Sequence, residues 1–233
     1  MFGENEKLSI ENKDGRQLKV TEIFSTIQGE GPNAGRVAIF IRLSGCNLAC
    51  SFCDTKFDRY TQLTIQNILK KVLHERSKIT SFTDGKTLPS IDKILVVITG
   101  GEPFRQNIGA LCEILQENGF EVQIETNGTL YFKIPDNTTI VCSPKITNKV
   151  YHPIREDVLQ KTIALKFIIS CHLEGYDDIQ EIGQQAFNIP VYVQPMDEYD
   201  LKKNKRNIDK TIKIAMKHNA IVSIQLHKVM DIR

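Results

Sequence analysis

Short apolar runs alternate along this chain with segments of helical periodicity. The apolar runs are rich in β-branched residues, which is typical of buried strands. They lie at residues 18–27, 37–43, 94–99, 122–125, 140–142, 163–169, 191–194 and 221–225. Helical periodicity predicts helices at residues 64–75, 107–118, 177–187 and 208–218. The polar stretch 78–92 is expected to be a surface loop.

This alternation of strands and helices predicts an α/β fold. Strand–helix–strand units produce parallel strands joined by right-handed crossovers, so the pattern fits an open doubly wound sheet or a closed or partial βα barrel. The 233 residues contain no long linker and no internal repeat, and we expect one domain. In both architectures the ligand site lies at the carboxyl ends of the strands. Residues that follow a strand are therefore the candidates for function.

Composition and charge exclude several classes of protein. The chain has 30 Lys and Arg against 28 Asp and Glu, and a net charge of +2 is too small for a sequence-independent nucleic-acid binder. No apolar run approaches the roughly 20 residues of a membrane span, and the first residues lack the pattern of a targeting peptide. We therefore expect a cytoplasmic protein with no direct contact to nucleic acid or membrane. In that compartment the six cysteines are reduced thiols or metal ligands.

Three cysteines lie close together directly after the strand at 37–43. Cys46, Cys50 and Cys53 have the spacing C-x-x-x-C-x-x-C. Thiolates bind zinc or iron–sulfur clusters, and a four-iron cluster held by three cysteines keeps one iron open for a substrate or cofactor. The alternatives are a zinc site with a fourth ligand elsewhere, or three thiols that only pack. The other cysteines, Cys112, Cys142 and Cys171, are isolated and are expected to be structural.

The cysteine spacing, with the aromatic Phe52 before the last cysteine, resembles the radical S-adenosylmethionine (SAM) superfamily. The resemblance implies a 4Fe-4S cluster on the three cysteines, with the amino and carboxylate groups of SAM on the fourth iron. It also implies a single-domain partial (βα)6 barrel with reduced helices over residues 1–233, with an N-terminal extension at 1–19 and the cluster loop at 44–57.

The same resemblance implies the contacts to SAM. They would come from four segments at the ends of predicted strands. These segments are the cluster loop, the glycine turn TGGEP, SPK and QPMD. The residues are Phe52, Cys53, Asp54, Gly101, Ser143, Pro144, Lys145, Gln194, Pro195, Met196 and Asp197. For the glycine turn the alternative is an ordinary tight turn between a strand and a helix, and for Lys145 it is a solvated turn.

Further motifs narrow the resemblance. IFSTIQGEGPNAGR, RLSGCN, FCDT, TGGEP, IETNGT, SPK, QPMD and QLHK run from residue 23 almost to the C-terminus and resemble the 7-carboxy-7-deazaguanine synthase family. The resemblance implies conversion of 6-carboxy-5,6,7,8-tetrahydropterin to 7-carboxy-7-deazaguanine with loss of ammonia, in the synthesis of queuosine and other 7-deazapurines. It also implies Mg2+, a flavodoxin- or ferredoxin-type reductant and a homodimer.

The resemblance also implies contacts to the substrate and to Mg2+, at the positions of this sequence that match the family's motifs. The pterin would contact Ile27, Gln28, Gly29 and Thr99. Arg42 would offer its fork-shaped cation to the pterin carboxylate, and Thr55 would bind Mg2+ through its hydroxyl. The alternatives are a surface salt bridge for Arg42 and a helix N-cap for Thr55.

Two polar residues are candidate catalytic groups. Glu125 of IETNG and His227 of QLHK would hydrogen-bond the pterin ring or move a proton during ammonia loss, although a structural role for each stays open. The family often ends in a proline whose terminal group reaches the substrate. This chain ends in Arg233, so a substrate contact at Arg233 also stays open.

Two other functions share parts of the pattern. One is a radical SAM activase that installs a glycyl radical on a partner protein, and the other is an iron–sulfur or zinc binding module without catalysis. Arg42, Thr55 and the IQGEG segment favour a small anionic substrate. The basic run at 202–206 is expected to be a solvated loop that enters the next helix, and not a tRNA site.

Overall fold

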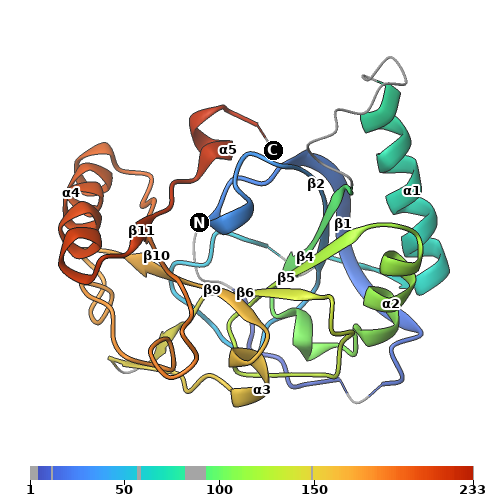
Figure 1. The fold of residues 1–233 in the computed structure, drawn as a ribbon, viewed down its shortest axis with the longest axis horizontal. Coiled ribbons are helices and arrows are strands. Elements are labelled where there is room, and N and C mark those ends of the chain that lie inside the picture. Colours follow the sequence, from blue (N-terminus) through green and yellow to red (C-terminus); the bar gives the residue numbers. More distant parts are fainter. Residues whose placement is uncertain (1–4, 12, 57–58, 82–92, 148, 233) are drawn as a thin grey trace. The chain divides into compact units, whose positions relative to one another are not determined.

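The computed structural model describes residues 5–11, 13–56, 59–81, 93–147 and 149–232. Its contacts divide the chain into two compact units, whose elements are labelled in Figure 1. Unit 1 comprises Met1–Gln28, Arg36–Glu125 and Leu130–Thr139, and unit 2 comprises Gly29–Gly35, Thr126–Thr129 and Ile140–Arg233. The expectation of one domain stays a prediction.

The strands of unit 1 lie in the order β5-β4-β2-β1-β3. Their bounds are β1 (Gln17–Ile27), β2 (Val37–Leu43), β3 (Thr61–Thr64), β4 (Leu95–Gly100) and β5 (Glu121–Thr126). As predicted, β2, β4 and β5 run parallel. In contrast, β1 pairs antiparallel with β2 and β3. Residues 28–36 connect β1 to β2, and this segment is shorter than the dozen or so residues that a parallel crossover needs.

Two helices accompany the strands of unit 1 and contact each other. They are α1 (Ile65–Ser81) and α2 (Gly109–Glu117), with the 3-10 turn η2 (Pro103–Arg105) before α2. Each buries aliphatic residues one turn apart, such as Ile68 and Val72 in α1. Helix α1 is longer than predicted, so the expected loop at 78–92 begins as helix. Residues 82–92 lie outside the described residues.

Unit 2 is built on strands in the order β11-β10-β9-β6, all parallel to their neighbours. The strands are β6 (Thr139–Cys142), β9 (Thr162–Ile169), β10 (Val191–Pro195) and β11 (Ile221–Val222), and β7 (Ile146–Thr147) and β8 (Val150–Tyr151) form a separate hairpin. The helices are η1 (Gly31–Asn33), α3 (Glu156–Leu159), α4 (Leu201–His218) and α5 (Leu226–Val229). The predicted strand at 221–225 is thus only two residues long.

The helix predicted at 177–187 is wrong, because this segment forms turns. Its polar side chains bond to nearby backbone in place of helical partners. Asp178 accepts from the amide of Ile179, and Glu181 accepts from the amide of Gly183. Short acidic and amide side chains compete with the helix in this way, and apolar periodicity does not reveal it.

The expectation of a loop at the basic run 202–206 is also wrong, because these residues form the first turns of α4. Asp200 caps the helix, and its Oδ1 accepts from the amides of Lys202 and Lys203 at 2.9 and 3.0 Å. Lys and Arg are good helix formers once a cap has satisfied the first amides.

Across the described residues, none of the helices has the length and apolar character that crossing a membrane requires.

Candidate functional site

The loop after β2 brings the three clustered cysteines into one half-buried region of unit 1. Cys46, Cys50 and Cys53 are free thiols, and the amide of Cys53 donates to the carbonyl of Cys50 at 3.1 Å. Burial raises the pKa of the Cys46 thiol to about 12, and the neighbouring sulfurs of Cys50 and Cys53 act in the same direction. Three soft sulfur donors within electrostatic reach of one another fit an iron–sulfur cluster.

The three thiols do not form a ready-made site for a single metal ion. Among the described residues, no three His, Cys, Asp or Glu side chains converge on one point where they would hold an ion. A structural zinc site requires such convergence of its ligands. In a four-iron cluster each cysteine binds a different iron, so the sulfurs stay apart. The choice between a cluster and a zinc site therefore depends on the family to which the chain belongs.

The glycine turn after β4 packs against the cluster loop. The amide of Gly101 donates to the carbonyl of Leu43 at 3.1 Å, and the amide of Glu102 donates to the carbonyl of Gly45 at 2.9 Å. A Cβ on Gly101 would lie 2.0 Å from the carbonyl oxygen of Gly45 and 2.9 Å from the amide nitrogen of Cys46. Only glycine allows this approach, so the TGGEP turn lies beside the first cysteine.

Arg42 at the end of β2 links a carboxylate to the cluster loop. Its Nε donates to Glu22 Oε1 at 2.7 Å, and its Nη1 donates to Thr55 Oγ1 at 3.3 Å. Both side chains of the Arg42–Glu22 pair are about one quarter exposed, at 25% and 27%. Thr99 is the register partner of Arg42 on β4. Thr55 starts no helix among the described residues, which excludes the N-cap alternative.

Gln28 and Glu125 form a second polar pair in unit 1. The side-chain amide of buried Gln28 donates to Glu125 Oε1 at 2.8 Å, and that of Gln123 donates to the same oxygen at 3.3 Å. Ile27 is the last residue of β1 and pairs with Val37. The orientation of the Glu125 carboxylate is thereby fixed by two amides.

In unit 2, the Gly29 loop packs against the C-terminal segment. The amide of Leu226 donates to the carbonyl of Gly29 at 3.0 Å, and a Cβ on Gly29 would lie 2.4 Å from His227 Nδ1. The next residue, Glu30, accepts hydrogen bonds from Lys166 Nζ and from Gln225 Nε2. The predicted contact residue Gly29 and the predicted catalytic residue His227 are therefore neighbours.

Burial would raise the pKa of Glu30, but opposing interactions outweigh it. The ammonium of Lys166, the Gln225 hydrogen bond and the charge of His227 hold the Glu30 pKa well below its ordinary value of 4.5. No sequence motif singles out Glu22, Glu30 or Lys166 as individual site residues. A signal for Lys166 existed, because it is a single charge inside the apolar strand IALKFII.

The SPK and QPMD motifs, also in unit 2, are engaged in internal hydrogen bonds. Lys145 Nζ donates to the carbonyl and to the hydroxyl of Ser143 at 2.7 and 2.8 Å. Gln194 Oε1 accepts from Ser223, and the amide of Met196 donates to Ile169. The SAM contacts expected here, including that of Pro195 at the end of β10, stay predictions.

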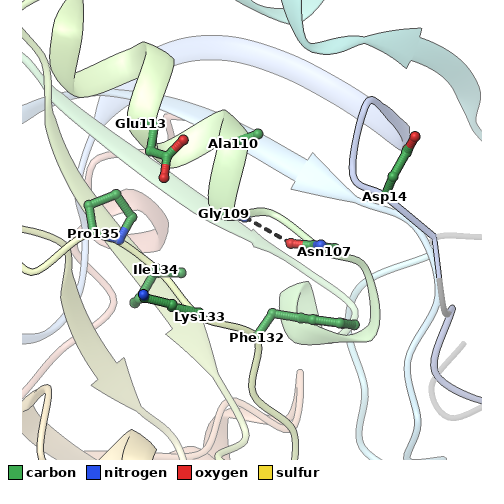
Figure 2. A pocket seen from close by; sticks show the side chains of 9 residues that line it. All are labelled: Asp14, Asn107, Gly109, Ala110, Glu113, Phe132, Lys133, Ile134 and Pro135. Carbon is green, nitrogen blue, oxygen red and sulfur yellow. Dashed lines mark hydrogen bonds between the residues drawn. The ribbon is translucent and has the colours of Figure 1, made fainter.

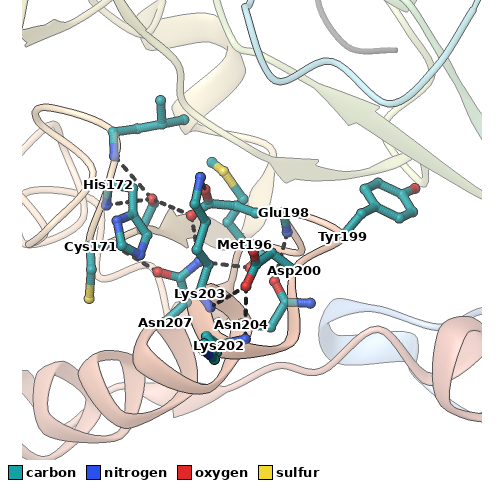
Figure 3. A network of polar contacts seen from close by, with 12 residues as sticks. Cys171, His172, Met196, Glu198, Tyr199, Asp200, Lys202, Lys203, Asn204 and Asn207 are labelled. Carbon is teal, nitrogen blue, oxygen red and sulfur yellow. Dashed lines mark hydrogen bonds and ion pairs between the residues drawn. The ribbon is translucent and has the colours of Figure 1, made fainter.

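Asp197 belongs to a polar network that joins the end of β10 to α4. Its carboxylate accepts from Lys228, from the amide of Tyr199 and from Asn204 at 2.7, 2.9 and 2.7 Å. Figure 3 shows the neighbouring part of the network, in which Asn207 donates to the carbonyl of Met196 and to Glu198. This network fixes the QPMD loop, and main-chain contacts to SAM would depend on it.

A cavity of about 390 Å3 in unit 1 contains none of the predicted site residues. It lies at the N-terminus of α2, where Asn107 Oδ1 accepts from the amide of Gly109 at 3.3 Å (Figure 2). The lining comprises Asp14, Asn107, Gly109, Ala110, Glu113, Phe132, Lys133, Ile134 and Pro135.

Four predicted residues remain. Arg233 lies outside the described residues, Cys112 and Cys142 are buried, and Cys171 is exposed.

Comparison with known proteins assigns the family. Residues 40–224 match the radical SAM superfamily. The chain belongs to this superfamily. A 7-carboxy-7-deazaguanine synthase of Rickettsia prowazekii is 49% identical over 232 residues, covering 100% of this chain and 96% of that protein. A synthase of the same name from Rhodospirillum rubrum is 30% identical over 252 residues and covers 100% of both chains.

A solved structure agrees with this assignment. The crystal structure of QueE from Escherichia coli has a TM-score of 0.67 and 25% sequence identity, and covers 90% of this chain and 94% of that one. The predicted family and the predicted fold class, an α/β fold of the partial (βα)6 radical SAM type, are therefore confirmed. As a radical SAM protein, this chain uses a 4Fe-4S cluster and SAM.

Proposed function

We propose that this radical SAM protein is a 7-carboxy-7-deazaguanine synthase. It would convert 6-carboxy-5,6,7,8-tetrahydropterin to 7-carboxy-7-deazaguanine with loss of ammonia, on the route to queuosine and other 7-deazapurines. The observation that carries this proposal is the position of Arg42. It lies on the strand that leads into the cysteine loop, is held by Glu22 and contacts Thr55. A fork-shaped cation held in this way suits the carboxylate of a small substrate.

Cys46, Cys50 and Cys53 would hold the cluster, which together with SAM would supply the radical chemistry for removal of a hydrogen atom from the substrate. A cysteine thiol releases its proton when it becomes a metal ligand. Burial, which raises the pKa of Cys46 to about 12, keeps this thiol protonated in the metal-free protein. The carbonyl of Gly101 suits the amino group of SAM. The other expected SAM contacts are Phe52, Asp54, Ser143, Pro144, Lys145 and the main chain of residues 194–197.

Thr55 and Arg42 would together bind the substrate carboxylate. The Thr55 hydroxyl suits Mg2+, a hard cation that keeps several waters and takes oxygen ligands from the substrate. Arg42 Nη1 lies 3.3 Å from the same hydroxyl. Two cations near one hydroxyl repel each other, and Glu22, whose Oε1 lies 2.7 Å from Arg42 Nε, offsets part of this repulsion. The carboxylate of the pterin would add a second anion at the same place.

Proton transfer during ammonia loss falls to Glu125 or His227. Gln28 and Gln123 fix one oxygen of Glu125, so its carboxylate can accept ring N–H groups of a pterin in a defined orientation. His227 is held against Gly29 by the close packing of the C-terminal segment. Ile27, Gln28, Gly29 and Thr99 would complete the contacts with the pterin.

Several wider features belong to the same proposal. We expect a cytoplasmic homodimer that receives electrons from a flavodoxin- or ferredoxin-type reductant, and a single domain over residues 1–233. Elution of the reconstituted protein as a dimer in size-exclusion chromatography, with one cluster per chain, would support the homodimer.

Anaerobic reconstitution with product analysis tests the function. The reaction would contain the reconstituted protein, SAM, Mg2+, a reductant and the carboxytetrahydropterin, and the product would be identified by mass spectrometry. We expect the deazaguanine, ammonia and 5′-deoxyadenosine. Cleavage of SAM without consumption of the pterin would instead indicate an activase. Metal binding without SAM cleavage would indicate a non-catalytic module.

A further inference from the structure

The segment at residues 5–11, here called the N-terminal strap, is attached to the cluster loop by specific polar contacts. The amide of Leu8 donates to the carbonyl of Cys46 at 2.8 Å, and Lys7 forms a β-bridge with Cys46. Asn5 Nδ2 lies 2.7 Å from the carbonyl oxygen of Thr55 and 3.4 Å from Cys53 Sγ. The strap therefore contacts the first and the last of the three cysteines.

The far end of the strap is fixed to the turn that follows β4. Arg105, whose side chain is only 3% exposed, donates to the carbonyl of Ser9 at 3.0 Å and to Glu11 Oε1 at 2.7 Å. The amide of Glu11 donates to the carbonyl of Arg105 at 2.8 Å. Apolar burial does not hold this segment, since Leu8 and Ile10 remain 39% and 38% exposed. Its attachment depends on polar contacts with the cluster loop and with Arg105 in the turn that follows β4.

The orientation of the Asn5 amide is determined by its partners. The carbonyl of Thr55 only accepts, so the NH2 group of Asn5 must face it, and the same NH2 group has a second hydrogen for the sulfur of Cys53. When Cys53 binds iron, its sulfur becomes a thiolate and a stronger acceptor. The contact is then an N–H···S hydrogen bond to a cluster ligand.

We propose that Asn5 is a positioning residue of the cluster, which raises its reduction potential and, through the strap, slows its loss in air. This rests on the proposed assignment of the cluster to the three cysteines. The reduced cluster carries one more negative charge than the oxidised cluster. Hydrogen bonds to its sulfurs therefore stabilise the reduced form more, and they are among the groups that set the potential of such clusters.

The test compares reconstituted Asn5→Ala and Asn5→Asp with wild type and with Glu6→Ala, a control at the exposed neighbouring position. Midpoint potentials come from titration followed by electron paramagnetic resonance, and cluster loss in air is followed by absorbance. We expect a more negative potential in Asn5→Ala and a further decrease in Asn5→Asp, whose added charge disfavours reduction. We expect cluster loss on the order of tenfold faster, as for other outer-shell partners of metal ligands.

A second variant tests the strap without touching the sulfur. Glu11→Gln weakens the attachment to Arg105 and Lys19, and we expect faster cluster loss with a smaller change in potential. Equal potentials and equal rates of loss in Asn5→Ala and Glu6→Ala would overturn the proposal. Failure of Asn5→Ala to load a cluster, with an unchanged melting curve of the apoprotein, would support it. These readouts need no pterin, so they are independent of whether the wild type forms the deazaguanine. Retention of the cluster by Cys53→Ala, which has no donor atom, would show that the cysteine assignment itself is wrong.

Discussion

Replacing Lys166 by Met removes one half of the Glu30–Lys166 pair in unit 2. The two side chains are 16% and 5% exposed, and Glu30 then retains the Gln225 hydrogen bond at 2.9 Å. Removal of one partner of a buried ion pair costs about 3–5 kcal/mol, because the remaining charge stays in a medium of low dielectric constant. Since the Glu30 side chain is 16% exposed and keeps the Gln225 hydrogen bond, we expect the lower end, about 3 kcal/mol of unfolding free energy.

The pH dependence of stability should change sign in this variant. In the wild type the pKa of Glu30 lies below its ordinary value of 4.5, so this group stabilises the fold above pH 4.5 and the contribution is lost as the pH falls through the folded pKa. In Lys166→Met we expect desolvation, the largest single influence, to outweigh the Gln225 hydrogen bond and the charge of His227, and to raise the folded pKa above the unfolded value. The folded variant then binds a proton more readily, and its stability increases as the pH falls from neutrality toward 4.5.

Urea unfolding of the apoprotein at pH 7.5 and pH 5, followed by circular dichroism, measures both effects. Lys213→Met on the exposed surface of α4 is the matched control and should change the free energy by less than about 0.5 kcal/mol. The double variant Glu30→Gln, Lys166→Met should recover most of the loss, because no charge is left buried. A loss below about 1 kcal/mol in Lys166→Met, or an unchanged pH trend, would refute the reasoning.

Three further predictions concern the candidate site. Glu22→Gln should raise the KM for the pterin about tenfold, which equals about 1.4 kcal/mol of binding free energy, because Arg42 loses the partner that orients it. The melting temperature should change little, and an unchanged KM in steady-state kinetics would contradict this prediction. Thr55→Ala should lose the stimulation by Mg2+ with normal iron content, and unchanged Mg2+ kinetics would remove Thr55 from the site. Gly101→Ala should lose SAM binding in equilibrium dialysis, because its Cβ would lie 2.0 Å from the carbonyl oxygen of Gly45; wild-type binding would show that the turn moves freely.

The parallel strands could be predicted from the sequence because burial on both faces gives them continuous apolar runs. In β4 the residues Leu95, Val96, Val97 and Ile98 are all fully buried, as the run predicts. Apolar spacing alone predicts a helix at 177–187, but spacing does not account for Asp178 and Glu181, whose carboxylates compete for nearby amides. Local hydrogen bonding therefore overrode periodicity there.

The residues of the candidate site also fall into those that a sequence motif contains and those that it does not. Cys46, Cys50, Cys53 and Thr55 lie within ten residues, so a motif contains them all. Glu22 is not predictable in this manner, because it faces Arg42 only through an irregularity in the register between Val20 and Glu22. Partners that come from other segments depend on the register and on the tertiary fold, which motifs do not encode.

The internal ion pairs narrow the choice of the proton-transferring group. Arg42 and Lys166 each lie in a largely apolar strand, where taking a cation out of water costs several kcal/mol unless an anion compensates. Glu22 compensates Arg42, and Glu30 compensates Lys166. A carboxylate whose pKa is lowered by its partner is a weak base near neutral pH, which excludes Glu30 as the general base. In the proposed reaction Glu22 holds Arg42, so we expect proton transfer from Glu125, to which the neutral amides of Gln28 and Gln123 donate, or from His227, which packs against Gly29.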